Sequence, residues 1–272
     1  MPRIHPTAIV HDGAGLADDV EVGPYCVIEP DVQIGAGCLL REHVIIRRYT
    51  TIGQRNLFDA FCVIGGQPQD LKFKPDTVSY VRIGNDNTFR EGVTISRATD
   101  NGKATVVGNK NFWMALAHAG HNVTVEDDVI LTNGVVIGGH ATIGRRAILS
   151  AHAGVHQFCW IGEGVMTQGN AGFSTHVPPF TVGAGINRLV GLNTVGLRRN
   201  PEITDHDREQ IKEAFGLVYR SGLTRTQALA EMDARADWGG PAKRFRDFIR
   251  RVLEAQPPYD RGLCQLRAKT GT

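Results

Sequence analysis

The sequence predicts a mainly β fold, a left-handed parallel β-helix of hexapeptide repeats, followed by a small α-helical C-terminal domain. Three observations support this prediction. Apolar residues recur at every sixth position over most of residues 4–173, and glycine often follows them. The period then changes to the three-and-four spacing of amphipathic helices. Two stretches without the six-residue period interrupt the first part, as loops would.

The six-residue period falls in three runs, which cover residues 4–64, 83–95 and 107–173. Of the 26 positions in these runs, only Thr167 is polar. A helix repeats every 3.6 residues and a strand every two, so neither alone produces this pattern. Hexapeptide periodicity is typical of a parallel β-helix, in which three hexads, about 18 residues, form one coil of a triangular prism.

Two loops and two domains follow from the breaks in the period. Residues 66–80 and 97–106 lack the hexad and are expected to project from the prism as loops. We expect the β-helix to span residues 1–195 and a helical domain to span 196–272. Within the latter, Thr204 is a candidate N-cap, and the segment 224–227 (Thr-Arg-Thr-Gln) reads as a capping box.

Composition excludes several classes of protein. No apolar run reaches the roughly 18 residues that a membrane-spanning helix needs, so we expect no membrane span. The five cysteines are scattered and never spaced as CxxC, which predicts reduced thiols and a cytoplasmic location. Residues 198–272 carry 15 Lys and Arg against 11 Asp and Glu, an excess of four, which is too small to indicate nucleic-acid binding.

Five of the ten histidines lie between residues 118 and 156. With about 18 residues per coil, His121 lies one coil below Gly139, which precedes His140, and two coils below Gln157. These side chains should share one stretch of the outer face, with His118 close by. A neutral imidazole can act as a general base near pH 7, and the Gly138–Gly139 backbone could stabilise an oxyanion.

Other interpretations of the histidines remain open at this point. His118, His121 and His140 could supply three imidazole ligands to a metal ion. No carboxylate or cysteine is expected near them to complete a structural zinc site, so we expect no metal and no cofactor. Alternatively, they are surface residues without a shared role.

Several segments resemble UDP-N-acetylglucosamine 3-O-acyltransferases, and the resemblance extends over essentially the whole chain. The matching segments are Gln69-Asp70-Leu71-Lys72, Ala117-His118-Ala119-Gly120-His121-Asn122, Gly138-Gly139-His140, Val155-His156-Gln157-Phe158-Cys159, Val177-Pro178-Pro179, Gly196-Leu197-Arg198-Arg199 and Tyr219-Arg220-Ser221-Gly222. The resemblance implies transfer of a (R)-3-hydroxyacyl chain from acyl carrier protein to the 3-hydroxyl of UDP-N-acetylglucosamine, in the first step of lipid A biosynthesis. It also implies a homotrimer with active sites between neighbouring prisms.

The same resemblance implies roles for individual residues. His121 is the expected general base, and the Gly139 N–H is the expected oxyanion donor. Gly169 lies where the family sets acyl-chain length, and a glycine there is expected to favour a longer chain. The expected substrate-binding residues are Asp70, Lys72, His118, His140, His156, Gln157, Asn193 and Arg199.

Three positions depart from the family pattern. Asn122 stands where an aspartate is usual, Val195 where a glutamate is usual, and Ser96 where a histidine is common. A divergent paralogue that acylates another nucleotide sugar, for example an amino variant, is therefore an alternative. A γ-type carbonic anhydrase and a non-catalytic trimeric scaffold are two further alternatives from other functional classes.

Overall fold

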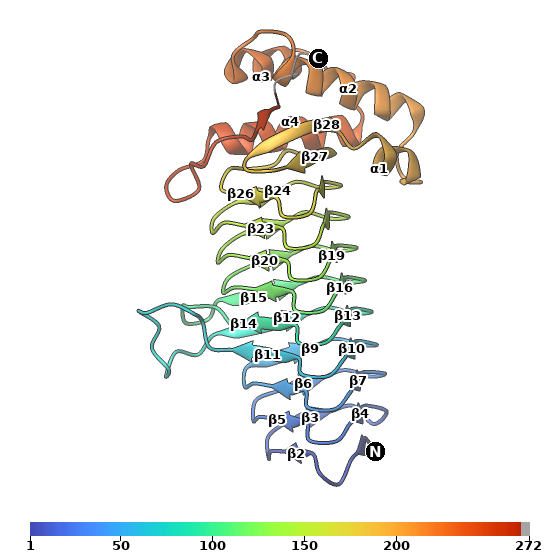
Figure 1. Cartoon of the computed structure of the whole chain (residues 1–272), viewed down its shortest axis with the longest axis vertical. Helices are drawn as coiled ribbons and strands as arrows, with labels where there is room; N and C mark the ends of the chain where they lie inside the picture. Colours follow the sequence, from blue (N-terminus) through green and yellow to red (C-terminus); the bar gives the residue numbers. More distant parts are fainter. Residues whose placement is uncertain (268–272) are drawn as a thin grey trace.

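In the computed structural model, which describes residues 1–267, the chain winds into a long triangular prism with helices at its C-terminal end (Figure 1). Each coil contributes one short strand to each of three faces. Partners in neighbouring coils are 18 residues apart in the regular parts, as for His118 and Val136. The predicted parallel β-helix is therefore confirmed.

Face A is the 12-stranded sheet, and it continues beyond the last regular coil. Its strands are β1 (Arg3–Ile4), β4 (Glu21–Val22), β7 (Leu39–Leu40), β10 (Leu57–Phe58), β13 (Thr88–Phe89), β16 (Phe112–Trp113), β19 (Ile130–Leu131), β22 (Ile148–Leu149), β25 (Met166–Thr167), β27 (Thr181–Ala184), β28 (Arg188–Leu192) and β29 (Gln265–Leu266).

Faces B and C are the nine- and eight-stranded sheets. Face B contains β2 (Ile9–Val10), β5 (Val27–Ile28), β8 (Ile45–Ile46), β11 (Val63–Gly66), β14 (Thr94–Ser96), β17 (His118–Ala119), β20 (Val136–Ile137), β23 (Gly154–Val155) and β26 (Gly172–Phe173). Face C contains β3 (Gly15–Leu16), β6 (Gln33–Ile34), β9 (Thr50–Ile52), β12 (Tyr80–Ile83), β15 (Ala104–Val107), β18 (Thr124–Val125), β21 (Thr142–Ile143) and β24 (Trp160–Ile161).

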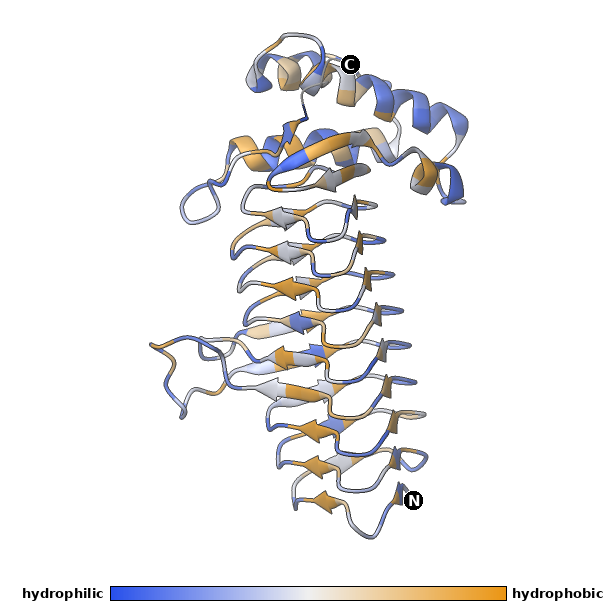
Figure 2. Cartoon of the chain, in the orientation of Figure 1, coloured by the Kyte–Doolittle hydropathy of each residue, from blue (hydrophilic) through white to orange (hydrophobic). Residues whose placement is uncertain are grey.

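The hexad aliphatics form the core. In most two-residue strands the second side chain is buried in the prism and the first faces outward, as for His118 and Ala119 in β17. The hydrophobic colour accordingly follows the strands, whereas the corners are mostly hydrophilic (Figure 2). Burial of this continuous apolar column between stacked coils stabilises the prism.

Both expected loops are present, with slightly different bounds. The first runs between β11 and β12, over residues 67–79, and projects sideways from the prism (Figure 1). The second is shorter than expected: it ends at residue 103, because residues 104–107 pair with β12 over four residues. The backbone of residue 102 donates to the carbonyl of Val78, and Ser79 donates to the carbonyl of Ala98. The two loops therefore pack against each other.

The helices cap the last coil. They are α1 (Thr194–Arg199), α2 (Asp205–Tyr219), α3 (Arg225–Asp233) and α4 (Gly240–Leu253). Thr204 caps α2, and the predicted capping box of α3 forms between Thr224 and Gln227. The described residues contain no helix that is both long and apolar enough to span a membrane.

The C-terminal part does not consist of helices alone. After α4 the chain returns to the prism, and β29 pairs with β28 on face A. The phenol of Tyr219 in α2 donates to the carbonyl of Cys264 just before β29. Residues 268–272, which the expected helical domain included, lie outside the described residues.

Candidate active site

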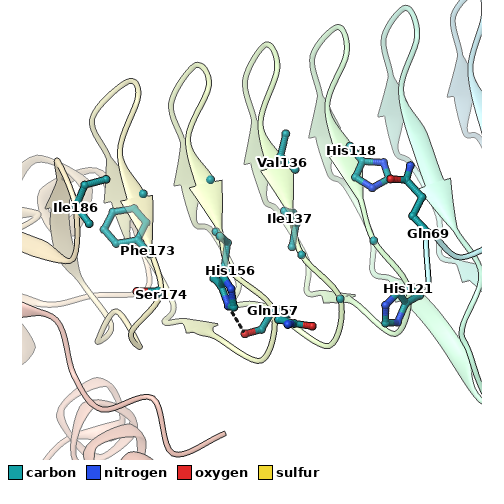
Figure 3. A pocket seen from close by; sticks show the side chains of 16 residues that line it. Gln69, His118, His121, Val136, Ile137, His156, Gln157, Phe173, Ser174 and Ile186 are labelled. Carbon is teal, nitrogen blue, oxygen red and sulfur yellow. Dashed lines mark hydrogen bonds between the residues drawn. The ribbon is translucent and has the colours of Figure 1, made fainter. Parts of the chain in front are cut away.

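A cleft of about 670 Å³ runs along face B between β17 and the last coils (Figure 3). Its floor consists of the outward-facing first residues of successive strands: His118, Val136, Gly154 and Gly172. A Cβ atom on Gly154 would have no neighbour within 4 Å, so glycine leaves the middle of the cleft open. Phe173 and Ile186 line the end nearest the helices.

His121 lies at the edge of this cleft, in the corner between faces B and C. Its Nδ1 atom is 3.0 Å from Oδ1 of Asn122. A carbonyl oxygen only accepts, so Nδ1 carries the proton and donates to Asn122. Nε2 is therefore unprotonated in the neutral ring and able to accept a proton from a substrate.

Gly139 lies one coil above His121 and lines the same cleft. A Cβ atom there would come within 2.6 Å of both Cε1 and Nε2 of His121, so only glycine allows the imidazole this position. Within residues 1–267, the Gly139 N–H has no hydrogen-bond acceptor. The His121 imidazole and a free backbone donor therefore lie next to each other.

The other histidines surround this pair. The His118 ring is hydrogen-bonded through Nδ1 to the Thr94 hydroxyl at 2.7 Å, and burial lowers its pKa. His140 does not line the cleft, but its ring packs edge-on against His121 with centroids 5.1 Å apart. Burial, and secondly the charge of His121, lower the pKa of His140. Both rings are therefore neutral near pH 7.

His156 and Gln157 line the same cleft (Figure 3), and they belong to the coil that follows that of Gly139. Nδ1 of His156 lies 3.2 Å from the carbonyl oxygen of Gln157, so this nitrogen donates and Nε2 is the free acceptor. The structure thus brings five of the predicted site residues to one cleft: His118, His121, Gly139, His156 and Gln157.

The first loop brings Gln69 to the cleft, whereas the predicted residues Asp70 and Lys72, which follow it in the loop, do not line the cleft. Oδ1 of Asp70 accepts the backbone N–H of Lys72 at 2.8 Å, which orders the loop tip as an Asx turn. Arg97, which the sequence analysis missed, holds this loop: its Nη2 donates to the Pro75 carbonyl and its guanidinium contacts the Phe73 ring. Because Arg97 lies outside the hexad, no periodicity indicated it.

Asn193 and Arg199 lie elsewhere. They line a separate pocket of about 330 Å³ over face A, together with Val195 and Met166. Asn193 is the N-cap of α1, where its Oδ1 accepts the Gly196 N–H and its Nδ2 donates to the Gly164 carbonyl. A single chain therefore does not bring these two residues to the His121 cleft.

Gly169 also lies outside the cleft lining. It is in the corner between faces A and B, where a Cβ atom would lie 3.5 Å from the carbonyl oxygen of Ala151. The side chain of a larger residue would therefore fit against the corner without a severe clash.

No group of three or more His, Cys, Asp or Glu side chains within residues 1–267 is arranged to hold a metal ion. Two of the three imidazoles considered as ligands use one ring nitrogen internally: His118 with Thr94 and His121 with Asn122.

A hexapeptide β-helix with an imidazole and free backbone donors in a cleft on one face defines the class of acyltransferases with this fold. Residues 13–48 match the family described as bacterial transferase hexapeptide (six repeats), and residues 176–264 match Udp N-acetylglucosamine O-acyltransferase, domain 2. The chain belongs to the acyl-[acyl-carrier-protein]–UDP-N-acetylglucosamine O-acyltransferase family, and it is an acyltransferase.

Three relatives illustrate this membership. The Synechocystis sp. acyl-[acyl-carrier-protein]–UDP-N-acetylglucosamine O-acyltransferase is 44% identical over 86% of this chain and 85% of its own. The Syntrophobacter fumaroxidans enzyme of the same name is 39% identical over 91% and 96%. The crystal structure of UDP-N-acetylglucosamine O-acyltransferase from Moraxella catarrhalis has a TM-score of 0.89 and 38% identity, covering 96% of this chain and 99% of its own.

Proposed function

We propose that the chain transfers a (R)-3-hydroxyacyl group from acyl carrier protein to the 3-hydroxyl of UDP-N-acetylglucosamine, as the first step of lipid A biosynthesis. The observation that carries the proposal is the pairing of an unprotonated His121 Nε2 with the Gly139 backbone in one cleft. The names of the relatives supply the substrates. The acyl-transfer interpretation is thereby favoured over the carbonic anhydrase and the scaffold.

The reaction uses Nε2 of His121 first and the Gly139 N–H second. His121 Nε2 removes the proton of the sugar hydroxyl, and the oxygen attacks the thioester carbonyl. The tetrahedral oxyanion accepts the Gly139 N–H. When the intermediate collapses, the carbon–sulfur bond breaks and the carrier-protein thiolate takes the proton back from His121. The base is thus restored without a cofactor.

The acyl chain lies along the glycine-lined part of the cleft. From His118 the floor passes Gly154 and Gly172 to the end at Phe173 and Ile186. Three coil-to-coil steps at about 4.8 Å give a groove of about 14 Å. This run is apolar, as a hydrocarbon chain requires. Gly169 would influence the chain length through the corner beside this groove.

The sugar nucleotide is bound by residues of two copies. Asp70, Lys72, His118, His140, His156 and Gln157 belong to the face B side, whereas Asn193 and Arg199 belong to face A. The two sets meet only if face A of one copy lies opposite face B of the next. Such heterologous contacts close into a ring, and we propose a homotrimer.

The corner shared by faces A and B supports this arrangement. It carries Tyr25, Phe61 and Leu116 with exposed fractions of 58%, 61% and 69%. Exposed apolar side chains in a row indicate a contact surface. With this corner at a threefold axis, each face B would be opposite a neighbouring face A, and a cleft would open outward between them.

The assignment is tested by an acyl-transfer assay with purified protein, UDP-N-acetylglucosamine and a panel of 3-hydroxyacyl carrier proteins, read by mass spectrometry. The expected product gains one hydroxyacyl group. It disappears in His121→Ala and persists in the control His11→Ala, which changes an exposed histidine far from the cleft. Turnover by His121→Ala at the wild-type rate would overturn the mechanism. If no donor gives product, the same assay with other nucleotide sugars, including an amino sugar, tests the alternative acceptor.

The cytoplasm is the proposed location of this reaction. All five cysteines are buried and free. Thiols that persist unpaired fit a reducing compartment.

A further inference from the structure

Asn122 is hydrogen-bonded to the proposed base, and Thr99 in the second loop contacts the same Asn122 atom. Oδ1 of Asn122 accepts Nδ1 of His121 at 3.0 Å and the backbone N–H of Thr99 at 3.0 Å. The Thr99 hydroxyl lies 3.0 Å from this oxygen and 2.9 Å from Oδ2 of Asp100. Its single proton is therefore shared between two acceptors. Three potential donors converge on one carboxamide oxygen.

The orientation of this carboxamide decides whether His121 can act as a base. An asparagine side chain presents either its oxygen or its NH₂ group, and the two have nearly the same shape. If NH₂ faced His121, Nδ1 would have to accept, and the proton would move to Nε2. The replacement of aspartate by asparagine next to the histidine of a serine-protease triad has this effect, and it lowers kcat about 10⁴-fold.

Thr99 prevents the reversed orientation. Its backbone N–H can only donate, so the atom facing it has to be an acceptor. Turning the Asn122 side chain over would place its NH₂ group against this N–H, and the Thr99 N–H would lose its acceptor. We propose that Thr99 and Asn122 are positioning residues that lock His121 in its Nδ1–H form, so that this chain needs no carboxylate beside its base. The inference rests on the proposed acyl transfer.

The backbone of Asn122 is held independently of its side chain. Its N–H donates to Oγ1 of Thr105 at 2.8 Å. Its φ of 59° is in the left-handed region, which glycine adopts without strain. Asn122→Gly therefore removes the carboxamide and keeps the corner, whereas alanine would add backbone strain.

The tautomer can be measured without turnover. In protein carrying ¹⁵N-labelled histidine, long-range ¹H–¹⁵N correlation spectra distinguish Nδ1–H from Nε2–H for the ring assigned through the His121→Ala variant. We expect Nδ1–H in the wild type and in Asn122→Asp, and mainly Nε2–H or a mixture in Asn122→Gly. A wild-type spectrum with Nε2–H would overturn the inference. The predicted tautomer in a protein that transfers no acyl group would contradict the proposed function alone.

Steady-state kinetics test whether the Asn122 carboxamide is needed for turnover. Asn122→Gly should lower kcat about tenfold or more with little change in KM, because base catalysis is lost while the substrate contacts remain. Wild-type kcat in Asn122→Gly would overturn the inference.

Asn122→Asp should keep its activity, because either carboxylate oxygen accepts the His121 proton. It should also move the acid limb of kcat/KM to higher pH by about one unit, since a carboxylate favours the imidazolium. His118 and His156 line the same cleft as His121, His140 packs against its ring, and Asp70 and Asp100 act on His140; all five are unchanged between the two proteins. An unshifted limb would show that residue 122 does not act on His121.

A double-mutant cycle isolates Thr99. Thr99→Pro removes the backbone N–H that orients Asn122. A carboxylate is symmetrical and has no wrong orientation, so Thr99→Pro should reduce kcat several-fold in the wild type and have no effect in Asn122→Asp. Thr99→Val keeps the N–H and should therefore keep the Nδ1–H form of His121. Equal effects of Thr99→Pro in both backgrounds, including no effect in either, would overturn the role of Thr99.

Discussion

At the scale of single residues, the site depends on its glycines, which have no side chain, as much as on its histidines. Gly139 lets the His121 ring lie against the backbone. Gly154 and Gly172 leave the groove floor without side chains. The cleft is thus a part of face B where glycines replace the larger outward-facing side chains of a regular prism.

Gly139→Ala tests this dependence. The added Cβ would lie 2.6 Å from two atoms of the imidazole, so the ring has to move out of its position. We expect kcat to fall at least tenfold and the melting temperature to change little, because the side chain that yields is at the surface. Steady-state kinetics and thermal denaturation measure both quantities.

Gly216→Ala provides the matched control, since a Cβ atom on this α2 glycine would meet nothing within 4 Å. It should leave activity unchanged. Equal kinetics of Gly139→Ala and the wild type would contradict the placement of His121.

At the scale of elements, the six-residue period predicted the positions of residues in the regular coils, but it did not predict contacts made by the loops and the C-terminal segment. Eighteen-residue spacing was enough to place His121, Gly139 and Gln157 together, because stacked coils repeat in register. Thr99 and Arg97 lie in a loop without the repeat, so only the folded structure reveals their contacts. The return of β29 to face A was equally hidden, because a two-residue strand carries no periodic signal.

Arg97 is expected to act through the first loop. It is 3% exposed, and among residues 1–267 it has no carboxylate partner and its Nη1 makes no hydrogen bond. It packs against Tyr49 of the prism and Phe73 of the loop. Arg97→Met keeps much of this packing and removes an unpaired buried charge, so stability should be nearly unchanged. The loss of the Pro75 contact should loosen the loop and raise KM for the sugar nucleotide several-fold.

Steady-state KM and the rate of proteolytic cleavage within residues 67–79 measure this loosening. Arg82→Met is the control, since this exposed arginine of β12 lies over the ring of Tyr80 in the same strand. Unchanged KM together with unchanged cleavage would show that the loop is held by other contacts.

At the scale of the whole molecule, a buried histidine joins the prism to its C-terminal segment. His176 is fully buried; its Nδ1 accepts the Trp160 N–H at 3.0 Å, and its Nε2–H donates to the Tyr259 carbonyl at 2.7 Å. Burial lowers its pKa, and Arg251 and Arg261 lower it further. The folded protein therefore keeps this imidazole neutral.

The sign of the pH dependence follows from this shift. Below about pH 6.5 the unfolded chain binds a proton at His176 that the folded protein does not bind. The stabilisation is thus present above the unfolded pKa and is lost as the pH falls, by up to about 1.4 kcal/mol per pH unit. We expect the free energy of unfolding to decrease from pH 7.5 to 5.5. His176→Asn, which does not titrate, should show a smaller decrease in denaturant unfolding, and an equal decrease would contradict the assignment.

The proposed trimer makes a final prediction at this scale. The apolar corner between faces A and B would be buried at the axis, so a charge there should separate the subunits. Phe61→Glu places three carboxylates together in a trimer, which like-charge repulsion and desolvation disfavour. We expect light scattering to give a trimer mass for the wild type and a smaller mass for Phe61→Glu. In the proposed trimer, Asn193 and Arg199 of a neighbouring copy complete the cleft, so acyl transfer should fall in parallel with the trimer fraction. Full activity in a monomeric variant would show that one chain forms the whole site.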